Sequence, residues 1–218
     1  MLVRDYMTRH PFMAEPDMSI IEAQRYMGDN NIRHLPIVGD GKRLEGLVTR
    51  SSLLVDPGKL GSLDVWEITR YLSRLTVADI MVKREHVVTA APDATIEEAA
   101  RTMVERGIGC LPVVEDNVVV GLITENHLLR QLMEMMSMQM PGTRVTIWMP
   151  ARKKGELAKL VSAIAAQGWG IAALGGVIAP KDPDKWEAVV KVHNVSIAEV
   201  EAALSQIEGQ EIVDIREG

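Results

Sequence analysis

Apolar and polar positions follow the same order twice in the N-terminal part of the chain. Residues 5–54 and 79–129 each begin with a polar turn and continue with apolar side chains at helical spacing. Two short apolar runs follow, LPIV and LEGLVT in the first stretch, CLPVV and VVVGLIT in the second. Such a pattern predicts a helix and then a β-hairpin. Because self-similarity along a chain indicates a repeat architecture, we expect one structural unit written twice.

Polar residues mark the boundaries of these elements. Pro16–Ser19 precedes the first helical pattern and Pro92–Thr95 precedes the second, so each predicted helix begins at a turn that ends in a capping hydroxyl. The two apolar runs of each copy are separated by Gly39–Gly41 or by Glu115–Asn117, which predicts a hairpin turn.

Both copies end the second run in Gly-apolar-apolar-Thr, as GLVT and GLIT. A second helix is expected just after each threonine, near Ser51–Ser52 and Asn126–His127. Backbone N–H groups at a strand-to-helix turn are unpaired and carry partial positive charge. Thr49 and Thr124 are therefore expected at turns of the kind that can hold an anionic group.

Two further helices are predicted beside the repeats. Apolar residues recur at near-helical spacing after Ser62, which predicts a connecting helix over 62–75. Residues 128–142 have an apolar helical face rich in methionine, which suits packing on its own domain or a second subunit, or else an adaptable ligand groove. Pro141-Gly142 ends this helix and predicts a domain boundary.

Residues 143–218 follow a different pattern, of order βαββαβ. This order predicts the ferredoxin-like split βαβ arrangement. The predicted elements are the strand Arg144–Met149, the helix Gly155–Gln167, the strands Gly170–Ile178 and Trp186–His193 around a Pro180–Asp184 turn, the helix Ser196–Ile207 and the strand Glu211–Ile215. The expected class is α/β (α+β), with domains 1–142 and 143–218, and with repeat units near 1–56 and 76–136.

Composition narrows the function classes. The chain is 47% apolar and 25% charged, the usual mixture of a folded globular protein. A net charge of −6 without a long basic stripe argues against nucleic acid. No apolar run approaches a membrane span and the start lacks a signal region, so we expect a cytoplasmic protein. The single cysteine, Cys110, allows no internal disulfide and reads as a small buried apolar residue.

The duplicated order of helix, LPIV or LPVV, hairpin, GLVT or GLIT, and helix resembles the CBS domain pair, a tandem regulatory module, over residues 1–135. The resemblance implies two units packed as a pseudo-twofold pair, with clefts that bind adenine nucleotides or related adenosine compounds. It also implies that the motif threonine touches phosphate and that an aspartate three residues later accepts the ribose hydroxyls. Ser52 and His127 stand at that later position here, so weaker ribose binding is expected.

The resemblance places the residues ahead of each Leu-Pro pair at a cleft. Arg33 and His34 stand there in the first copy, and Arg33 offers a planar multi-donor fork for phosphate. Gly109 and Cys110 stand there in the second copy, so the two clefts should differ in affinity. Ser52 and His127 are either ligand contacts, His127 as a cation near phosphate, or ordinary helix-start residues. The candidate ligand-binding residues are Arg33, His34, Thr49, Ser52, Thr124 and His127.

The segment KKGELAKL, after the first strand of 143–218, resembles the loop-to-helix turn of ACT domains, which commonly bind amino acids at domain interfaces. ACT domains with ligands often carry an acidic residue shortly before that glycine, where Ala151, Arg152 and Lys153 stand here. The order CBS, CBS, ACT resembles the acetoin-utilisation regulatory family.

The sequence offers no enzyme's equipment. It has no nucleophile with a placed base, no Gly-rich phosphate loop followed by lysine, and no Cys/His/carboxylate cluster at metal spacing, so we expect neither a metal nor a catalytic cofactor. The leading hypothesis is a non-enzymatic sensor that binds AMP, ADP, ATP or a similar adenosine-type ligand and signals to the ACT-like domain or a partner. The alternatives are a ligand-independent scaffold and amino-acid sensing by the ACT-like domain. A homodimer is expected in each case.

Overall fold

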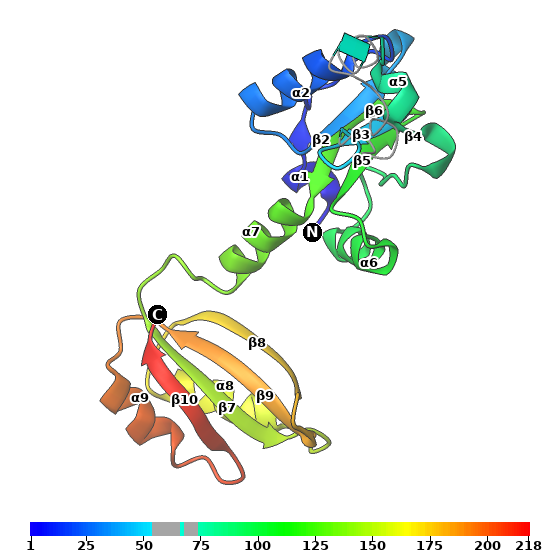
Figure 1. Cartoon of the computed structure of the whole chain (residues 1–218). Coiled ribbons are helices and arrows are strands. Elements are labelled where there is room, and N and C mark those ends of the chain that lie inside the picture. The colour runs from blue at the N-terminus through cyan, green and yellow to red at the C-terminus, as the bar shows by residue number, and fades with distance from the viewer. Residues whose placement is uncertain (54–65, 68–73) are drawn as a thin grey trace. The chain divides into compact units, whose positions relative to one another are not determined.

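The structure is a computed structural model that describes residues 1–53, 66–67 and 74–218 (Figure 1). It consists of two compact units, Met1–Leu128 and Leu129–Gly218. Both units combine helices with antiparallel sheets, so the predicted mixed α/β class is confirmed. Nearly all of the predicted connecting helix over 62–75 lies outside the described residues.

The first unit contains two three-stranded sheets, each built around one of the predicted hairpins. One sheet has the strand order β2-β3-β4 and the other β1-β6-β5. The predicted helix and hairpin are found in both copies. The elements are β1 (Thr8–Arg9), α2 (Ile20–Asp29), β2 (His34–Val38), β3 (Leu44–Thr49), β4 (Val82–Lys83), α6 (Ile96–Arg106), β5 (Cys110–Glu115) and β6 (Val118–Thr124).

The capping residues predicted for the two helices are confirmed. Ser19 precedes α2, and its Oγ accepts a hydrogen bond from the backbone N–H of Glu22 at 3.2 Å, while the Glu22 carboxylate accepts one from the Ser19 N–H at 3.1 Å. Thr95 and Glu98 form the same capping box at α6. These reciprocal bonds satisfy N–H groups that the first helical turn leaves unpaired.

The hairpin turns differ between the copies. In the second copy Asp116 and Asn117 both have positive φ, 49° and 67°, which matches a tight two-residue turn. The first copy instead has a short 3-10 turn, η1 (Asp40–Lys42), in which Gly41 has a φ of 66°. A second 3-10 turn, η2 (Arg84–His86), follows β4.

The beginning of each copy packs into the other copy, which the sequence pattern does not reveal. The short helix α1 (Val3–Tyr6) buries Val3 in the core of the second copy, and β1 pairs with β6. The short helix α5 (Val77–Ile80) buries Val77 in the core of the first copy, and β4 pairs with β3. The two repeats therefore fold as one body.

The glycine of each Gly-apolar-apolar-Thr run makes this exchange possible. A Cβ at Gly46 would overlap the Met81 sulfur and lie 2.8 Å from the carbonyl oxygen of Val82. A Cβ at Gly121 would overlap the Met7 side chain. Met7 and Met81 thus fill the space that a missing side chain leaves on the strand of the other copy.

An apolar cluster joins residues of both sheets and supports the pseudo-twofold pairing of the copies. Cys110 belongs to it and is buried, as predicted. Burial is the main cause that raises the pKa of its thiol to about 12, and the nearby Glu125 carboxylate adds to this effect. A thiol with such a pKa stays protonated and serves packing. The cluster comprises Val38, Leu44, Leu47, Val87, Cys110, Val119 and Leu122.

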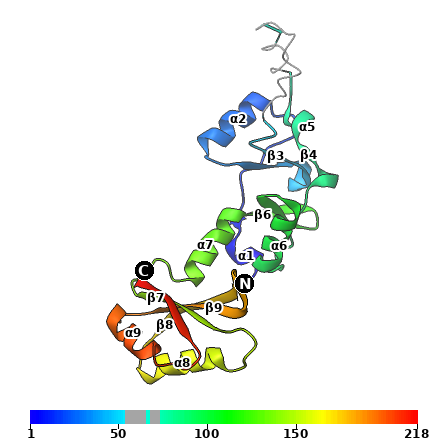
Figure 2. The same ribbon diagram turned by 60° about the horizontal axis from the view of Figure 1, so that its bottom comes forward.

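The second unit has the predicted βαββαβ order, and its sheet has the strand order β10-β7-β9-β8. Figure 2 shows both helices on one face of this sheet, where Leu160, Ile164, Val200 and Leu204 complete its core. The elements are β7 (Thr143–Pro150), α8 (Glu156–Ala166), β8 (Ile171–Ala179), β9 (Asp182–Val192), α9 (Ile197–Leu204) and β10 (Glu211–Glu217).

One predicted boundary in this unit is wrong. β9 begins at Asp182, so the turn after β8 is shorter than the predicted Pro180–Asp184 segment. The polar residues at the start of β9 extend the sheet because Lys185 pairs opposite Pro150 and places its ammonium 4.2 Å from the centre of the Trp148 ring. This cross-strand contact outweighs the turn preference of the local sequence.

The helix α7 (Glu125–Met135) starts in the first unit and ends in the second. Its apolar residues Leu129, Leu132 and Met133 are exposed, so the predicted packing of this face on its own domain is not seen for them. Beyond the helix, the backbone carbonyl of Ser137 accepts a hydrogen bond from Lys191 Nζ at 3.0 Å, which holds the following segment on the sheet of the second unit. Among the described residues, no helix is long and apolar enough to cross a membrane.

Candidate ligand-binding cleft

A cavity of about 260 Å³ lies between the two repeats of the first unit. Three predicted site residues line it: Arg33 and His34 from the first copy and Thr124 from the second. Arg33 is exposed and His34 is half-buried. The other lining residues are Thr8, Pro11, Phe12, Asn31, Ile32, Gly109, Leu122, Glu125 and Asn126.

Hairpin register positions these groups. His34 lies opposite Thr49 across the first hairpin, and Cys110 lies opposite Thr124 across the second. The backbone carbonyl of the residue before each strand then accepts a hydrogen bond from the residue after the motif threonine. These bonds are Arg50 N–H to Arg33 O and Glu125 N–H to Gly109 O, both 3.0 Å. Each turn is thereby fixed beside the start of its neighbouring strand.

His127 caps the second turn from within. Its Nδ1 accepts a hydrogen bond from the Thr124 backbone N–H at 3.0 Å and lies 3.0 Å from Thr124 Oγ1, while Nε2 lies 3.2 Å from Thr8 Oγ1. A backbone N–H can only donate, so Nδ1 uses its lone pair and the ring proton is on Nε2. This arrangement uses a neutral ring, because a doubly protonated ring would lose the Thr124 bond. The contact of a cationic His127 with phosphate stays a prediction.

Ser52 has the corresponding role in the first turn. Its Oγ accepts a hydrogen bond from the Thr49 N–H at 3.3 Å, and its own N–H donates to Thr49 Oγ1 at 3.2 Å. Thr49 Oγ1 also lies 2.8 Å from Ser51 Oγ. Residues 51–53 form a turn, and the helix expected next lies outside the described residues. Of the six predicted site residues, Thr49, Ser52 and His127 are not among those that line the cavity beside Arg33.

Electrostatics in the cavity depend on opposite charges from the two copies. Burial lowers the pKa of His34, the Glu125 carboxylate partly opposes this, and the Arg33 guanidinium adds to the lowering. His34 is therefore mainly neutral near pH 7. The Glu125 carboxylate also stands near the Gly109 backbone, 3.4 Å from the place of a Cβ there. The cavity thus combines a cationic group and an anionic group with neutral donors and acceptors.

Several lining residues were missed by sequence reasoning. Thr8 belongs to the exchanged strand β1, and Phe12 follows it. Only the pairing of β1 with β6 of the other copy brings these two residues to the cavity. Glu125 follows directly after the motif threonine, at the position of Arg50 in the first copy. Comparison of the copies at that position was the signal that could have found it.

The chain matches known proteins over this unit. The CBS domain family model matches residues 3–56 and 77–134. The structure of AcuB, an acetoin utilization protein from Vibrio cholerae, shares 30% identity and a TM-score of 0.53 over 64% of this chain and 95% of that chain. The CBS domain pair of protein MJ0100, solved in complex with 5′-methylthioadenosine and S-adenosyl-L-methionine, shares 29% identity and a TM-score of 0.50 over 61% and 95%.

Curated sequences match over the same part of the chain. Homoserine O-acetyltransferase from Methanosalsum zhilinae is 30% identical over 58% of this chain and 23% of its own length. The chain spans about a quarter of the length of this relative and of two others, an L-aspartate semialdehyde sulfurtransferase and a second homoserine O-acetyltransferase. The two segments matched by the family model contain both repeats with the cavity between them. The chain belongs to the CBS domain family.

Proposed function

We propose that the chain is a non-enzymatic regulatory sensor and that an adenosine-type ligand, such as AMP, ADP, ATP or a similar compound, binds in the cavity between the repeats. The observation that carries this proposal is the convergence of Arg33, His34 and Thr124, from two separate repeats, on one cavity. The adenosine compounds bound to the related MJ0100 domain pair support the ligand class.

The cavity chemistry suggests how such a ligand lies. A phosphate or other anionic group faces the Arg33 guanidinium, which donates several hydrogen bonds in one plane. The adenine ring lies against Phe12 and Ile32, two of the apolar lining residues of the first copy. The carboxylate that the motif lacks at His127 is supplied by Glu125, which accepts the ribose hydroxyls.

We further propose one adenosine site per chain. Gly109 and Cys110 stand where the first copy has Arg33 and His34, so the second copy offers no cation at this position. Cys110 is also buried in the apolar cluster between the copies. The ligand therefore distinguishes the two clefts, as the sequence predicts.

The route of signalling that we propose starts at α7. Glu125 and Asn126 line the cavity and form its first turn, and the same helix ends at Met135 in the second unit. A ligand that binds more tightly to one position of this turn shifts the populations of the alternative positions of the helix that follows. The second unit then acts as an ACT-like domain, over the predicted range 143–218, or passes the signal to a partner. A cytoplasmic homodimer is part of this proposal.

An observation in the second unit weighs against amino-acid sensing there. Glu156 is 2% exposed at the first turn of α8, and its Oε1 lies 3.2 Å from Lys153 Nζ and 2.9 Å from Lys159 Nζ. This carboxylate occupies the helix start, where the carboxylate of an amino acid would be attracted. A thermal-shift screen of the amino acids tests this alternative; stabilisation by one of them would restore it.

Calorimetry tests the proposed site. AMP, ADP, ATP, S-adenosylmethionine and NADH are titrated into the full chain, and at least one is expected to bind with one site per chain. Arg33→Ala is expected to lower the affinity for that ligand by about tenfold or more, because a charge-assisted hydrogen bond contributes roughly 1.5–3 kcal/mol. Arg25→Ala, which removes an exposed arginine paired with Asp29 outside the cavity, is the matched control and should bind normally. No heat from any compound at millimolar concentration contradicts the sensor and leaves the ligand-independent scaffold, whose partner a pull-down would recover with or without nucleotide.

A second variant tests the role of Glu125. Glu125→Gln keeps the size of the side chain and removes the anionic acceptor. The variant is expected to lose more affinity for a ribonucleotide than for the 2′-deoxy form of the same nucleotide. The difference in affinity between the two ligands should therefore be smaller in the variant than in the unaltered chain. Equal loss for both ligands would assign Glu125 a purely structural role.

A further inference from the structure

The end of α7 is closed by a backbone motif in which two methionines hold the key positions. The Met138 N–H donates to the Met133 carbonyl at 3.0 Å, and the Ser137 N–H donates to the Glu134 carbonyl at 2.9 Å. Ser137 has a positive φ of 49°. Two such bonds around a left-handed residue form a Schellman motif, in which an apolar contact between the residues of the longer bond usually completes the cap. Met133 and Met138 are those two residues.

This cap has little to hold it. Glycine is the usual left-handed residue of the motif because a side chain disfavours positive φ, and Ser137 stands there instead. Met133 and Met138 are exposed by 41% and 61%, so little apolar surface is buried between them. A change that makes these two side chains polar therefore favours the open form of the turn.

The same turn attaches the end of α7 to the sheet of the second unit. The Ser137 hydroxyl donates to the Ala172 carbonyl at 2.8 Å, and the Ser137 carbonyl accepts a hydrogen bond from Lys191 Nζ at 3.0 Å. Lys191 is 4% exposed, and a buried charge is costly unless it is hydrogen-bonded. The position of Ser137 thus decides whether this ammonium has its acceptor.

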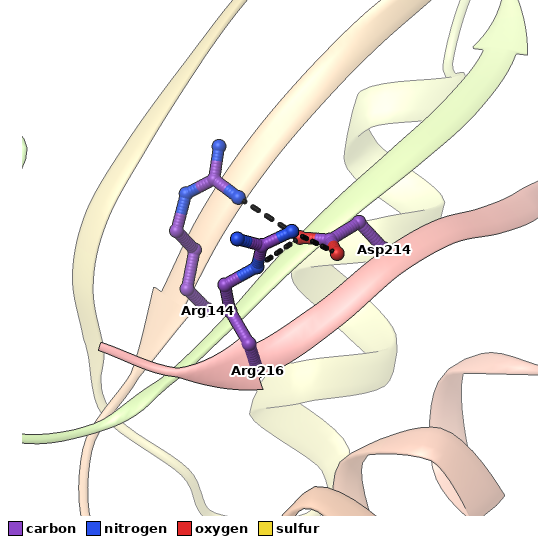
Figure 3. A network of polar contacts seen from close by, with 3 residues as sticks. All are labelled: Arg144, Asp214 and Arg216. Atoms are coloured by element: carbon purple, nitrogen blue, oxygen red, sulfur yellow. Dashed lines mark hydrogen bonds and ion pairs between the residues drawn. The ribbon is translucent and has the colours of Figure 1, made fainter.

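The cations beside Lys191 already share the nearest acidic group. Lys191 lies opposite Arg144 across the ladder of β9 and β7. Figure 3 shows Arg144 and Arg216 converging on the Asp214 carboxylate, with distances of 3.2 Å and 2.8 Å to Oδ2. Among the described residues, no ion pair includes Lys191. An open turn therefore leaves Lys191 to water, and the end of α7 loses its attachment to the sheet.

We propose that residues 133–140 are a site of methionine oxidation and that sulfoxide formation at Met133 and Met138 opens this turn. The oxidant is hydrogen peroxide. The thioether sulfur attacks one peroxide oxygen, so an S–O bond forms, the O–O bond breaks, and the second oxygen leaves as water with both peroxide hydrogens. The sulfur loses the two electrons that the peroxide gains, and the apolar side chain becomes a polar sulfoxide.

Access favours this segment over the rest of the chain. Met135 and Met140 in the same segment are also exposed, whereas Met27 and Met103 are buried in the cores of the two repeats. Oxidation of methionine depends on contact between the sulfur and the oxidant. The input is an oxidant and not a nucleotide, so the inference goes beyond the proposed function and needs no ligand in the cavity.

Limited peroxide treatment of the full chain tests the site. Peptide mass spectrometry is expected to find an added oxygen at Met133 and Met138 before Met27 and Met103. Hydrogen exchange of residues 136–140 in the oxidised chain is expected to be at least about threefold faster, while exchange of α8 stays unchanged. Oxidation that reaches the buried methionines first would overturn the proposal. Exchange that does not change after oxidation, or that rises equally in α8, would also overturn it.

Two double variants separate the cap from general oxidation of the segment. Met133→Leu with Met138→Leu keeps both side chains apolar and removes the two sulfurs, so peroxide should no longer speed the exchange of residues 136–140. Met135→Leu with Met140→Leu is the matched control and should respond to peroxide as the unaltered chain does. An equal response of both variants to peroxide would contradict the assignment to Met133 and Met138.

Discussion

His34 shows how the environment of one side chain sets a pH dependence. Its ring is half-buried, and burial is the largest cause of its lowered pKa. The folded pKa lies below the unfolded value of about 6.5, so the unfolded chain takes up the proton first as the pH falls. The stability that neutral His34 contributes is fully present above about pH 6.5 and is lost as the pH falls from there toward the folded pKa.

His34→Asn removes this titration. The free energy of unfolding of the unaltered chain is therefore expected to decrease more than that of the variant between about pH 7.5 and about pH 5.5. Denaturant unfolding of both proteins across this range measures the difference and cancels the contribution of the other histidines. Parallel pH profiles would show that the lowered pKa of His34 has no weight in folding.

At the residue scale, the repeat and the family resemblance predicted Arg33, His34 and Thr124 of the cavity lining but not its other residues. Arg33 and His34 could be predicted because they precede a Leu-Pro pair that recurs in both copies. Thr8 and Glu125 were not, since their places depend on a strand exchange and on the approach of two distant turns. The role of His127 also depends on Thr8, a residue far away in sequence.

At the scale of elements, the two motif glycines carry different constraints. The Cβ of an alanine at Gly46 would meet the Met81 side chain and the backbone carbonyl of Val82, which cannot rotate away. At Gly121 the nearest atoms all belong to the flexible side chain of Met7. Gly46→Ala is therefore expected to lower the free energy of unfolding by about 1–3 kcal/mol, and Gly121→Ala by less, because Met7 can adopt another rotamer.

Denaturant unfolding of these two single variants measures the difference. Each variant is the other's control, because both change the same residue type at the same position of its repeat. Equal destabilisation, or a larger effect at Gly121, would show that the contact with the Val82 backbone is not the limiting one.

Elements with a strong local signal were predicted, and those that depend on partners were not. The helices α2 and α6 have capping boxes and a regular apolar spacing, so their starts were predicted correctly. The helix α1 has four residues and the strand β1 has two, which is too short for any apolar period. The start of β9 reads as a turn from its Asp and Pro residues and becomes a strand through its pairing with β7.

At the scale of the whole molecule, the duplication explains why the cavity lies between two similar units. Two copies with the same fold create two related clefts, and substitutions at Arg33, His34, Gly109 and Cys110 make them chemically different. The central claim is that the cleft lined by Arg33 holds an adenosine-type ligand, while the helix that starts at its wall carries the response.

Hydrogen exchange of the full chain with and without a saturating adenine nucleotide tests this claim most directly. The account predicts slower exchange at residues 31–34 and 124–127, where the cavity wall and the first turn of α7 lie, and little change at 49–52. Arg33→Ala should remove that protection at the same nucleotide concentration. Unchanged exchange at 31–34 and 124–127 under conditions in which calorimetry shows binding would contradict the account, because the ligand would then be held elsewhere.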